Sequence, residues 1–370
     1  MVILADSQST IAAVDVRSPP RQSPLGLSVI VCCHNSGGRL ATTLAHLAAQ
    51  TGIAGDRWEV VLVDNASTDG TGDRARLLWA TSGASAPLRI VSEPKLGLSY
   101  ARNAGISAAR HKIVSFVDDD NWVCPTWCAT VLRLMTAHPE IGAIACRSDA
   151  AFESGQIVPP WFPSLQHGYA VGPQGEKTGW VETPLPRYSG AGISFRRDAV
   201  CSLLQRGFST LLTGRLGKQL ISGEDAEICY ALGMSGHRFW YEESLRFTHF
   251  MPPGRLTDEY ARQLYRGLGA ASAIEDFYLE FDAGRADPSL RARLKKVAVF
   301  RYINVLGKIL RYELRALLAP SGSASRSQAR IEASYFKGRF SGLLTYRKKG
   351  RAIYAHIAGW ARSAIPQGGS

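Results

Sequence analysis

The sequence lacks long apolar runs. No stretch approaches the ~20 consecutive apolar residues that a membrane-spanning helix needs. Residues 1–26, rich in Ser, Ala, Pro and Gln, also lack the positively charged start and apolar core of a signal peptide. We therefore predict a disordered leader over residues 1–26 and expect that any contact between the protein and a membrane is peripheral.

Paired cysteines are missing as well. The seven cysteines form no Cys-x-x-Cys pair and lie mostly in apolar surroundings, at positions 32, 33, 124, 128, 146, 201 and 229. An odd number of such cysteines is typical of reduced thiols in the cytosol, so we expect a cytoplasmic protein. The spacing of Cys124 and Cys128 suits a metal site, but no second pair accompanies it, and we expect both to pack in a helix.

Acidic residues are scarce near the C-terminal end. Residues 285–370 contain 18 Lys or Arg and three acids, a net charge of +15, whereas the whole chain carries +12. A basic segment can meet nucleic acid or anionic lipid. No recognised nucleic-acid-binding module accompanies the charge, so we expect no nucleic-acid partner.

Residues 290–319 predict a basic amphipathic helix. Apolar side chains recur at helical spacing, at Leu294, Val297, Tyr302, Val305, Ile309, Leu314 and Leu317. Cations lie between them, at Arg291, Lys295, Arg301, Lys308, Arg311 and Arg315. Two placements stay open: the helix lies on an anionic membrane surface, or it packs its apolar stripe on the rest of the protein and solvates its charges.

The first half of the chain alternates short apolar runs with helical patterns. Strands are expected over residues 27–33, 58–63, 88–92 and 113–117, and helices follow from about residues 40, 71 and 98. This order predicts a doubly wound, mostly parallel α/β sheet flanked by helices. Polar residues follow several of the strands, and ligands bind at the carboxyl ends of strands in such sheets.

Three consecutive carboxylates, Asp118, Asp119 and Asp120, follow the apolar run 113–117. Like charges this close raise one another's pKa values, and a divalent cation with oxygen ligands relieves the repulsion. The cluster therefore indicates a Mg²⁺ or Mn²⁺ site at the end of a strand. The alternative is a solvated acidic turn that caps the next helix.

Two later segments add candidates. The Gly- and Pro-rich, aromatic segment 154–186 predicts loops and short strands over the active face, where they would shape an acceptor pocket. The glycines in 188–197 fit either a close approach of substrate to the backbone or a bulge at a sheet edge.

Acids recur at the start of a later helix. Glu224, Asp225 and Glu227 open an apolar helix, where they either complement the helix dipole or supply a general base beside a metal. His249 follows another apolar run and is either a packed residue or a further Mn²⁺ ligand.

Taken together, these motifs resemble glycosyltransferase family two, of the GT-A fold. The matching stretches follow the family order over about 230 residues, at 28–35, 61–71, 97–105, 116–120 and 223–225. The resemblance implies transfer of a sugar from a nucleoside diphosphate donor to an acceptor hydroxyl, with inversion at the anomeric carbon. It also implies a catalytic domain over 27–255 and leaves 256–370 as a basic helical extension.

The resemblance also implies roles at the donor end. Asp64 and Arg102 would hold the nucleobase, with His34 stacked near it and Asn35 beside His34. UDP is the default donor nucleotide, because it is the common one in the family.

The acidic residues take the remaining roles that the resemblance implies. Asp118 would contact the ribose or the metal-bound phosphates, Asp120 would be the main metal ligand, and His249 would help to bind metal or diphosphate. Asp119 lies between them, and the family motif does not fix how the three acids divide the work. Asp225 is the best candidate for the base, with Glu224 as second choice.

A metal cation and one base suffice for a single displacement, which inverts the anomeric centre. No Ser-His-Asp or Cys-His constellation suggests a covalent nucleophile. We therefore expect an enzyme that builds a surface glycan or glycolipid on a lipid-linked acceptor at the inner face of the membrane. Two alternatives stay open: a nucleotidyltransferase, disfavoured because no Gly-rich triphosphate loop follows the first strand, and a catalytically silent membrane scaffold.

Overall fold

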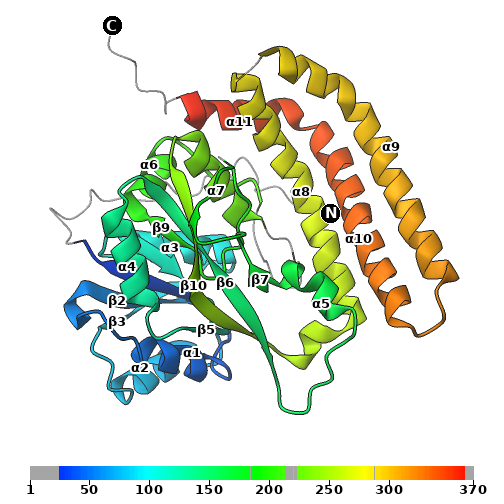
Figure 1. Ribbon diagram of the computed structural model, residues 1–370. Coiled ribbons are helices and arrows are strands. Elements are labelled where there is room, and N and C mark those ends of the chain that lie inside the picture. Colours follow the sequence, from blue (N-terminus) through cyan, green and yellow to red (C-terminus); the bar gives the residue numbers. More distant parts are fainter. Residues whose placement is uncertain (1–24, 184, 213–219, 221–222, 287, 363–370) are drawn as a thin grey trace, which may run out of the picture.

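The structure of the chain is a computed structural model. It describes residues 25–183, 185–212, 220, 223–286 and 288–362, and it describes the side chains of helix α9 only from Phe300 onward. Nearly all of the predicted leader 1–26 lies outside the described residues. An α/β body and a layer of long C-terminal helices stand side by side (Figure 1).

Strands and helices alternate through the first half of the chain in the expected order. The elements are β1 (Leu27–Cys33), α1 (Leu40–Ala48), β2 (Trp58–Asn65), α2 (Thr71–Ala80), β3 (Leu88–Glu93), α3 (Leu98–Ala108), β4 (Ile113–Phe116), β5 (Asn121–Val123) and α4 (Trp127–Ala137). Further strands and helices follow, namely β6 (Ile141–Phe152), β9 (Ser194–Arg196), α6 (Arg197–Gln205), α7 (Glu224–Met234) and β10 (Arg238–Met251).

One mixed sheet organises the body, with the strand order β3-β2-β1-β4-β9-β6-β10-β5. The first four of these strands are parallel, and Cys33 pairs with Asp64 where β1 and β2 end. Strand β9 runs antiparallel to both β4 and β6, and β6 and β10 are again parallel. The sequence predicted the parallel half, and within the stretch 188–197, which has strand character, only Ser194–Arg196 join the sheet.

The sheet separates two hydrophobic cores. Along β1, Val29 and Val31 point into one core with α1, α2 and α4, whereas Ile30 points into the other with α3, α6 and α7. Successive side chains of a strand face opposite sides of a sheet, so a continuous apolar run is buried on both faces. This burial explains why the apolar runs were a reliable signal for strands.

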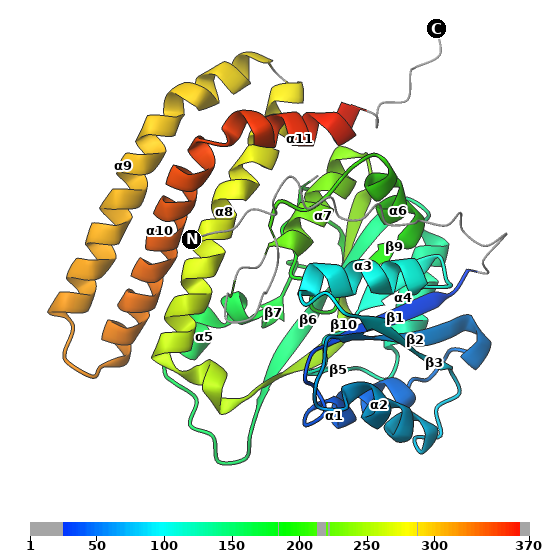
Figure 2. The ribbon, with the colours of Figure 1, turned by 180° about the vertical axis from the view of Figure 1, so that it is seen from behind.

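In the part of the chain that the structure describes, four α-helices follow the sheet: α8 (Asp258–Ala286), α9 (Pro288–Leu318), α10 (Ala324–Arg347) and α11 (Gly350–Arg362). Helix α8 packs on the body, α10 lies against α8, and α9 forms the outer edge of the layer (Figures 1 and 2). Helix α11 returns to the body, where Ile353, Ile357 and Trp360 join the core of α3, α6 and α7. Within the described residues, no helix is long and apolar enough to cross a membrane.

Glycines let α8 and α10 approach closely. A Cβ atom at Gly269 would lie 1.9 Å from the Tyr335 carbonyl oxygen, and one at Gly338 would lie 2.0 Å from the Arg266 carbonyl oxygen. The contacting atoms are backbone atoms and cannot move away without separating the helices. Glycine is therefore required at both positions for this crossing.

The aromatic segment 154–186 forms short elements, as expected. They are α5 (Phe162–Leu165), the 3-10 turn η2 (Gln166–Tyr169), β7 (Gly172–Pro173) and β8 (Gly179–Trp180). Trp161, Phe162 and Tyr169 pack with Leu264 of α8 and Ile331 of α10 in a third small core. The segment thus joins the α/β body to the helical layer.

Candidate functional site

A cavity of about 890 Å³ opens where the strands end, between the α/β body and the helical layer. This volume falls within the range of small-molecule sites. Most residues predicted for the site line this cavity, namely His34, Arg102, Asp118, Asp119, Asp120, Glu224, Asp225 and His249. Asn35 and Asp64 are not among its lining residues.

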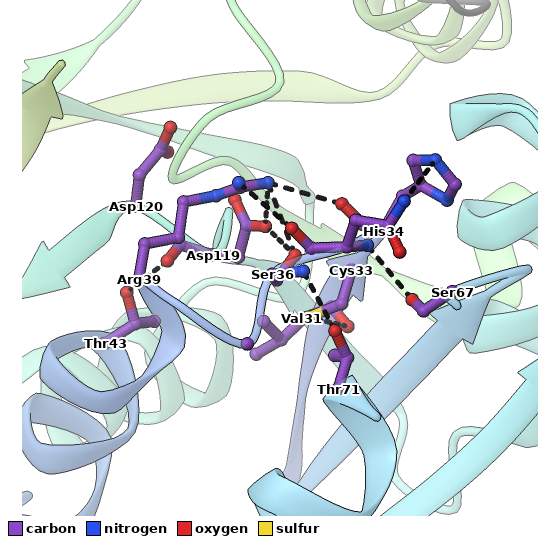
Figure 3. Close-up of polar contacts among 12 residues, drawn as sticks. Val31, Cys33, His34, Ser36, Arg39, Thr43, Ser67, Thr71, Asp119 and Asp120 are labelled. Atoms are coloured by element: carbon purple, nitrogen blue, oxygen red, sulfur yellow. Dashed lines mark hydrogen bonds and ion pairs between the residues drawn. The ribbon is translucent and has the colours of Figure 1, made fainter. Parts of the chain in front are cut away.

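Asp119 binds the loop after β1. Its carboxylate accepts a hydrogen bond from Ser36 Oγ and lies 2.6 Å from Arg39 Nη2, as Figure 3 shows. Its backbone carbonyl also accepts a hydrogen bond from Thr43 Oγ1 of α1. Burial and, next, the charge of Asp120 raise the pKa of Asp119, while Arg39 and Ser36 oppose this shift. Asp119 therefore ties α1 to the acidic loop.

Asp120 is surrounded by groups from the end of β10. Its Oδ2 lies 2.8 Å from Arg255 Nη2, and its Oδ1 lies 3.4 Å from His249 Nε2. The side chains of Asp120 and His249 are almost completely buried. The charge of Asp120 raises the pKa of Arg255 although burial alone would lower it. Asp120 is thus a buried carboxylate that a cation already neutralises.

The third acid, Asp118, lines the cavity without a side-chain partner among the described residues. Asp118 and Asp120 thus differ, because only the latter is enclosed by charged neighbours. The sequence alone could not show this difference in surroundings, since the three acids are adjacent in the chain.

A metal ion would find two protein donors here. His249 Nε2 lies 3.4 Å from Asp120 Oδ1, and Arg255 Nη1 lies 3.1 Å from the same nitrogen, so Arg255 stands where a metal would bind. No group of three or more His, Cys, Asp or Glu side chains that could hold a metal occurs among the described residues. Two donors suit a Mg²⁺ or Mn²⁺ that takes its other ligands from substrate phosphates and water. The residues fit such a shared site rather than an all-protein cage.

At the ends of β1 and β2, His34 and Asn65 face the cavity. The Nδ1–H of His34 donates to the Asn65 carbonyl oxygen at 2.8 Å. The Asn65 amide donates to the carbonyl oxygens of Glu93 and Lys95 and accepts from the Gly97 N–H. Asn65 therefore holds the loop before α3 against the cavity.

Asp64 and Asn35 lie elsewhere. Asp64 lines a separate cavity of about 320 Å³ beside α2. Asn35 has a left-handed backbone, with φ of 50°, and its side chain accepts a hydrogen bond from the Thr68 N–H. We infer that Asn35 shapes the turn after β1, and that Asn65 takes the cavity position expected for Asp64. Successive residues of a strand face opposite sides of the sheet, so Asn65 and its neighbour Asp64 point in opposite directions, and only the Asn65 side chain meets the cavity.

Arg102 of α3 reaches the acids at the start of α7. Its Nη1 lies 3.0 Å from Glu224 Oε1 and also bonds Asp225 Oδ1. Asp225 Oδ2 accepts a hydrogen bond from the Gly190 N–H at 2.7 Å. Arg102 therefore pairs with both acids. One carboxylate oxygen of Asp225 is held by Arg102 and the other by the Gly190 N–H.

Gly190 and Gly192 make room for side chains of the protein. A Cβ atom at Gly190 would lie 2.4 Å from Arg102 Nη2 and from Asp225 Cγ. One at Gly192, where φ is 76°, would lie 2.7 Å from Cys146 Sγ and Phe247 Cε1. The contacts with Arg102 and Asp225 are sufficient to explain the glycine at position 190. Neither of the two earlier explanations, close approach of a substrate or a bulge at a sheet edge, is needed there.

The helical layer supplies the far wall of the cavity. Tyr260, Tyr265 and Leu268 come from α8, and Tyr335 comes from α10. Residues 167–174, from the aromatic segment, line the same end. Sequence reasoning missed these tyrosines and also Arg39 and Arg255. The only available signal was a cluster of aromatic residues in a helical pattern, which is equally typical of core packing.

The family model for glycosyl transferase family 2 matches residues 28–203. The chain carries a glycosyl transferase family 2 segment. The resemblance seen in the motifs is thereby confirmed over that range, which includes the acidic loop and Arg102 but ends before Asp225.

Curated relatives carry glycosyltransferase names. The chain is 31% identical over 127 residues to the "Putative glycosyltransferase EpsH" of Bacillus subtilis (strain 168), covering 34% of this chain and 35% of that protein. It is 33% identical over 114 residues to the "Dodecaprenyl-phosphate galacturonate synthase" of Rhizobium johnstonii, covering 30% and 33% respectively. The chain thus spans about a third of the length of these relatives.

Among solved structures, the chain is similar to the mannosyltransferase PcManGT from Pyrobaculum calidifontis, whose structure contains GDP-Man and Mn²⁺. The TM-score is 0.52 at 22% identity, covering 88% of this chain and 90% of that one. At this identity the likeness concerns the fold. The predicted α/β fold class, GT-A with a helical C-terminal extension, is confirmed.

Proposed function

We propose that the protein is an inverting glycosyltransferase that moves a sugar from a nucleoside diphosphate sugar to an acceptor hydroxyl. One observation carries the proposal: a single cavity joins the Asp118–Asp120 cluster, His249 and Arg255 to the held carboxylate of Asp225. The Asp118–Asp120 cluster with His249 and Arg255 suits a diphosphate and its metal ion. The carboxylate of Asp225, held in place in the same cavity, suits a catalytic base. The family match and the names of the relatives support the same class of enzyme.

The donor nucleotide would enter at the ends of β1 and β2. His34, Asn65 and Gly97 line that part of the cavity and offer a ring and polar groups to a nucleobase. Arg102 is paired with Glu224 and Asp225. We therefore propose that it positions these two carboxylates and does not bind the nucleobase. UDP remains our default nucleotide.

Asp120 and His249 would hold Mn²⁺ or Mg²⁺ together with the donor diphosphate. When bound, the cation neutralises the charge that grows on the departing nucleoside diphosphate. Arg255, already against Asp120, brings a further positive charge to this end. Asp118, whose carboxylate has no partner in the described residues, is placed to accept hydrogen bonds from the ribose or to assist with the metal.

Asp225 is our proposed base. The Gly190 N–H and Arg102 fix the orientation of its carboxylate, whereas the side chain of Glu224 is only 3% exposed and bonds the Gly223 N–H. Burial raises the pKa of Cys32, in the same cavity, to about 12, so that thiol is not a nucleophile at neutral pH. A single displacement assisted by Asp225, with inversion, follows from these features.

The acceptor would lie at the aromatic end. Tyr260, Tyr265 and Tyr335 offer flat apolar faces with hydroxyl groups, which suit the apolar face and the hydroxyls of a sugar. A glycan or a lipid-linked sugar carries such a ring. The name of the Rhizobium relative is in line with a lipid-linked acceptor. We therefore retain a surface polysaccharide or glycolipid as the product and a cytoplasmic, membrane-peripheral location.

The test is donor turnover. The full-length protein is incubated with UDP-, GDP- and dTDP-sugars and Mn²⁺, and release of nucleoside diphosphate is measured, with water taking the place of the acceptor hydroxyl. We expect one donor class to be consumed, and Asp225→Asn to lower kcat by about 10²–10⁴-fold without loss of donor binding. Asp73→Asn, at an exposed position of α2, is the matched control. If Asp225→Asn left turnover unchanged, the assignment of Asp225 as the base would be wrong. Release of pyrophosphate from nucleoside triphosphates would favour a nucleotidyltransferase instead.

A further inference from the structure

The outer helix α9 exposes an unusual set of apolar side chains. They are between 48% and 76% exposed, and they are Phe300, Ile303, Leu306, Leu310, Leu314, Leu317 and Leu318. With 3.6 residues per turn, they fall within an arc of about 120° and extend over about 27 Å of helix. Single exposed leucines are ordinary, but a continuous stripe of this size marks a binding surface. We call these seven residues the α9 stripe.

The opposite side of α9 is fully engaged in the helical layer. Val305 and Ala316 are buried there, Tyr302 Oη donates to the Leu343 carbonyl oxygen, and the Tyr312 and Phe336 rings stack at 5.5 Å. The helix therefore has one packed side and one unpartnered apolar side in its described part. Of the two placements considered from the sequence, packing accounts for Tyr302, Val305 and Ile309, but it leaves Leu314 and Leu317 in solvent.

Cations border the α9 stripe along one edge. Lys308, Arg311 and Arg315 occupy the adjoining arc of about 60°. Glu313, the only acid of α9 between Phe300 and Leu318, is at the other edge and pairs with Lys337 at 2.5 Å. The exposed surface is therefore apolar with a positive border and no free negative charge.

We propose that the α9 stripe docks the protein on an anionic membrane surface, with α9 lying in the plane of the lipid headgroups. An apolar stripe beside Lys and Arg is the arrangement of interfacial helices, in which leucines enter the acyl boundary and cations meet acidic headgroups. A second copy of the chain fits less well. In an antiparallel pair the two positive borders would meet, and in a parallel pair each border would face only Glu313, which Lys337 already neutralises. This proposal does not depend on the glycosyltransferase activity.

The test uses the full-length protein and sedimentation with vesicles of phosphatidylcholine, alone or mixed with phosphatidylglycerol. We expect binding to the mixed vesicles only. The double change Leu310→Glu/Leu314→Glu should weaken it by roughly tenfold or more, because it places charge where apolar area would be buried. Arg311→Gln/Arg315→Gln should weaken it by about fivefold for each charge removed, and added salt should shrink that difference.

Matched controls lie on the α/β body. Leu77→Glu changes a leucine of α2 that is 67% exposed, and Arg110→Gln removes an exposed cation. Neither should alter vesicle binding. Because Leu310 and Leu314 are exposed, the leucine double variant should leave thermal unfolding unchanged, which separates lost docking from lost folding.

Three results would overturn the proposal. The first is absence of vesicle binding by the wild type, and the second is equal binding of the wild type and both double variants. The third is a dimer in sedimentation velocity that Leu310→Glu/Leu314→Glu dissociates, which would assign the stripe to a second copy. Donor turnover measured in solution separates all three from a failure of the proposed enzymatic function.

Discussion

Arg255 Nη2 lies 2.8 Å from Asp120 Oδ2, so the carboxylate proposed as the main metal ligand is neutralised by a cation of the chain itself. The backbone of Arg255 is fixed, because its carbonyl oxygen accepts a hydrogen bond from Tyr169 Oη. The guanidinium, whose Nη1 also lies 3.1 Å from His249 Nε2, is at the end of a long side chain, and we propose that it turns from Asp120 to another anion when one binds. A donor diphosphate is such an anion, and its metal is the cation that would replace Arg255 at Asp120.

The first prediction concerns Arg255→Gln. It should weaken binding of the nucleoside diphosphate by about tenfold or more, because a charged hydrogen bond is lost. The same change should strengthen binding of Mn²⁺ alone, because Asp120 no longer has a competing cation. Titration calorimetry with nucleotide and electron paramagnetic resonance with free Mn²⁺ measure the two effects separately.

Arg89→Gln provides the control, because Arg89 pairs with Glu59 away from the cavity. It should change neither affinity. If Arg255→Gln weakened Mn²⁺ binding, Arg255 would be a support for the metal site rather than a competitor.

A second prediction separates Asn65 from Asp64. Asn65→Ala removes the hydrogen bonds that hold residues 93–97 beside the cavity, and we expect nucleotide affinity to fall by about tenfold. Asp64→Ala changes a residue of the smaller cavity and should leave the affinity nearly unchanged. Both are measured by titration calorimetry below the unfolding temperature. The reverse order would restore the nucleobase role predicted for Asp64.

A third prediction concerns pH. Burial raises the pKa of Glu227 from 4.5 to about 8, although its carboxylate accepts hydrogen bonds from Leu211 N, Leu212 N and Tyr278 Oη. The folded protein keeps the proton in a range where the unfolded chain has lost it. This group's contribution to stability is therefore complete below pH 4.5 and declines as the pH rises to about 8.

Denaturant unfolding at several pH values measures this effect. Glu227→Gln cannot ionise, so its free energy of unfolding should depend less on pH between 5 and 8 than that of the wild type. Identical pH slopes for the two proteins would mean that Glu227 is already ionised in the folded state.

A fourth prediction tests the helical layer. Gly338→Ala places a methyl group against the Arg266 carbonyl oxygen and should lower the free energy of unfolding by about 1–3 kcal/mol. Gly307→Ala, in α9, meets no atom within 4 Å and should be neutral or stabilising by up to about 1 kcal/mol. Urea unfolding compares them. Equal stability of the two variants would show that the crossing of α8 and α10 is looser than described.

Sequence patterns predicted the parallel half of the fold because apolar strands buried on both faces, such as β1 and β2, leave continuous runs. They also predicted that His34 and Asp120 lie at one edge of the sheet, since both follow strands; Asp225, in the first turn of α7, and His249, within β10, line the same cavity. Strand character was predicted for 188–197, which contains β9, but the antiparallel pairing of β9 with β4 and β6 was not. Its pairing depends on contacts between residues far apart in the chain, which no local pattern records.

The partners of the site residues were also beyond the sequence. Arg102 was expected at the nucleobase, yet Glu224 and Asp225, more than a hundred residues away, hold it. Arg255 reaches the cavity from the 3-10 turn Pro253–Leu256 after β10, and Tyr335 reaches it because the helical layer packs on the body. Single-sequence patterns reveal which residues lie near strand ends, but ion pairs and cavity walls are set by packing.

The most direct test of the account is a thermal unfolding titration of the purified protein with UDP, GDP, dTDP and CMP, each with and without Mn²⁺. A ligand that binds only the folded state stabilises it by about 2.7 kcal/mol at a hundredfold excess over Kd. We predict that one nucleoside diphosphate raises the unfolding temperature, that the rise requires Mn²⁺, and that Asp120→Asn abolishes this Mn²⁺-dependent rise. No stabilisation by any nucleotide would contradict the assignment of this cavity to a nucleotide-sugar donor.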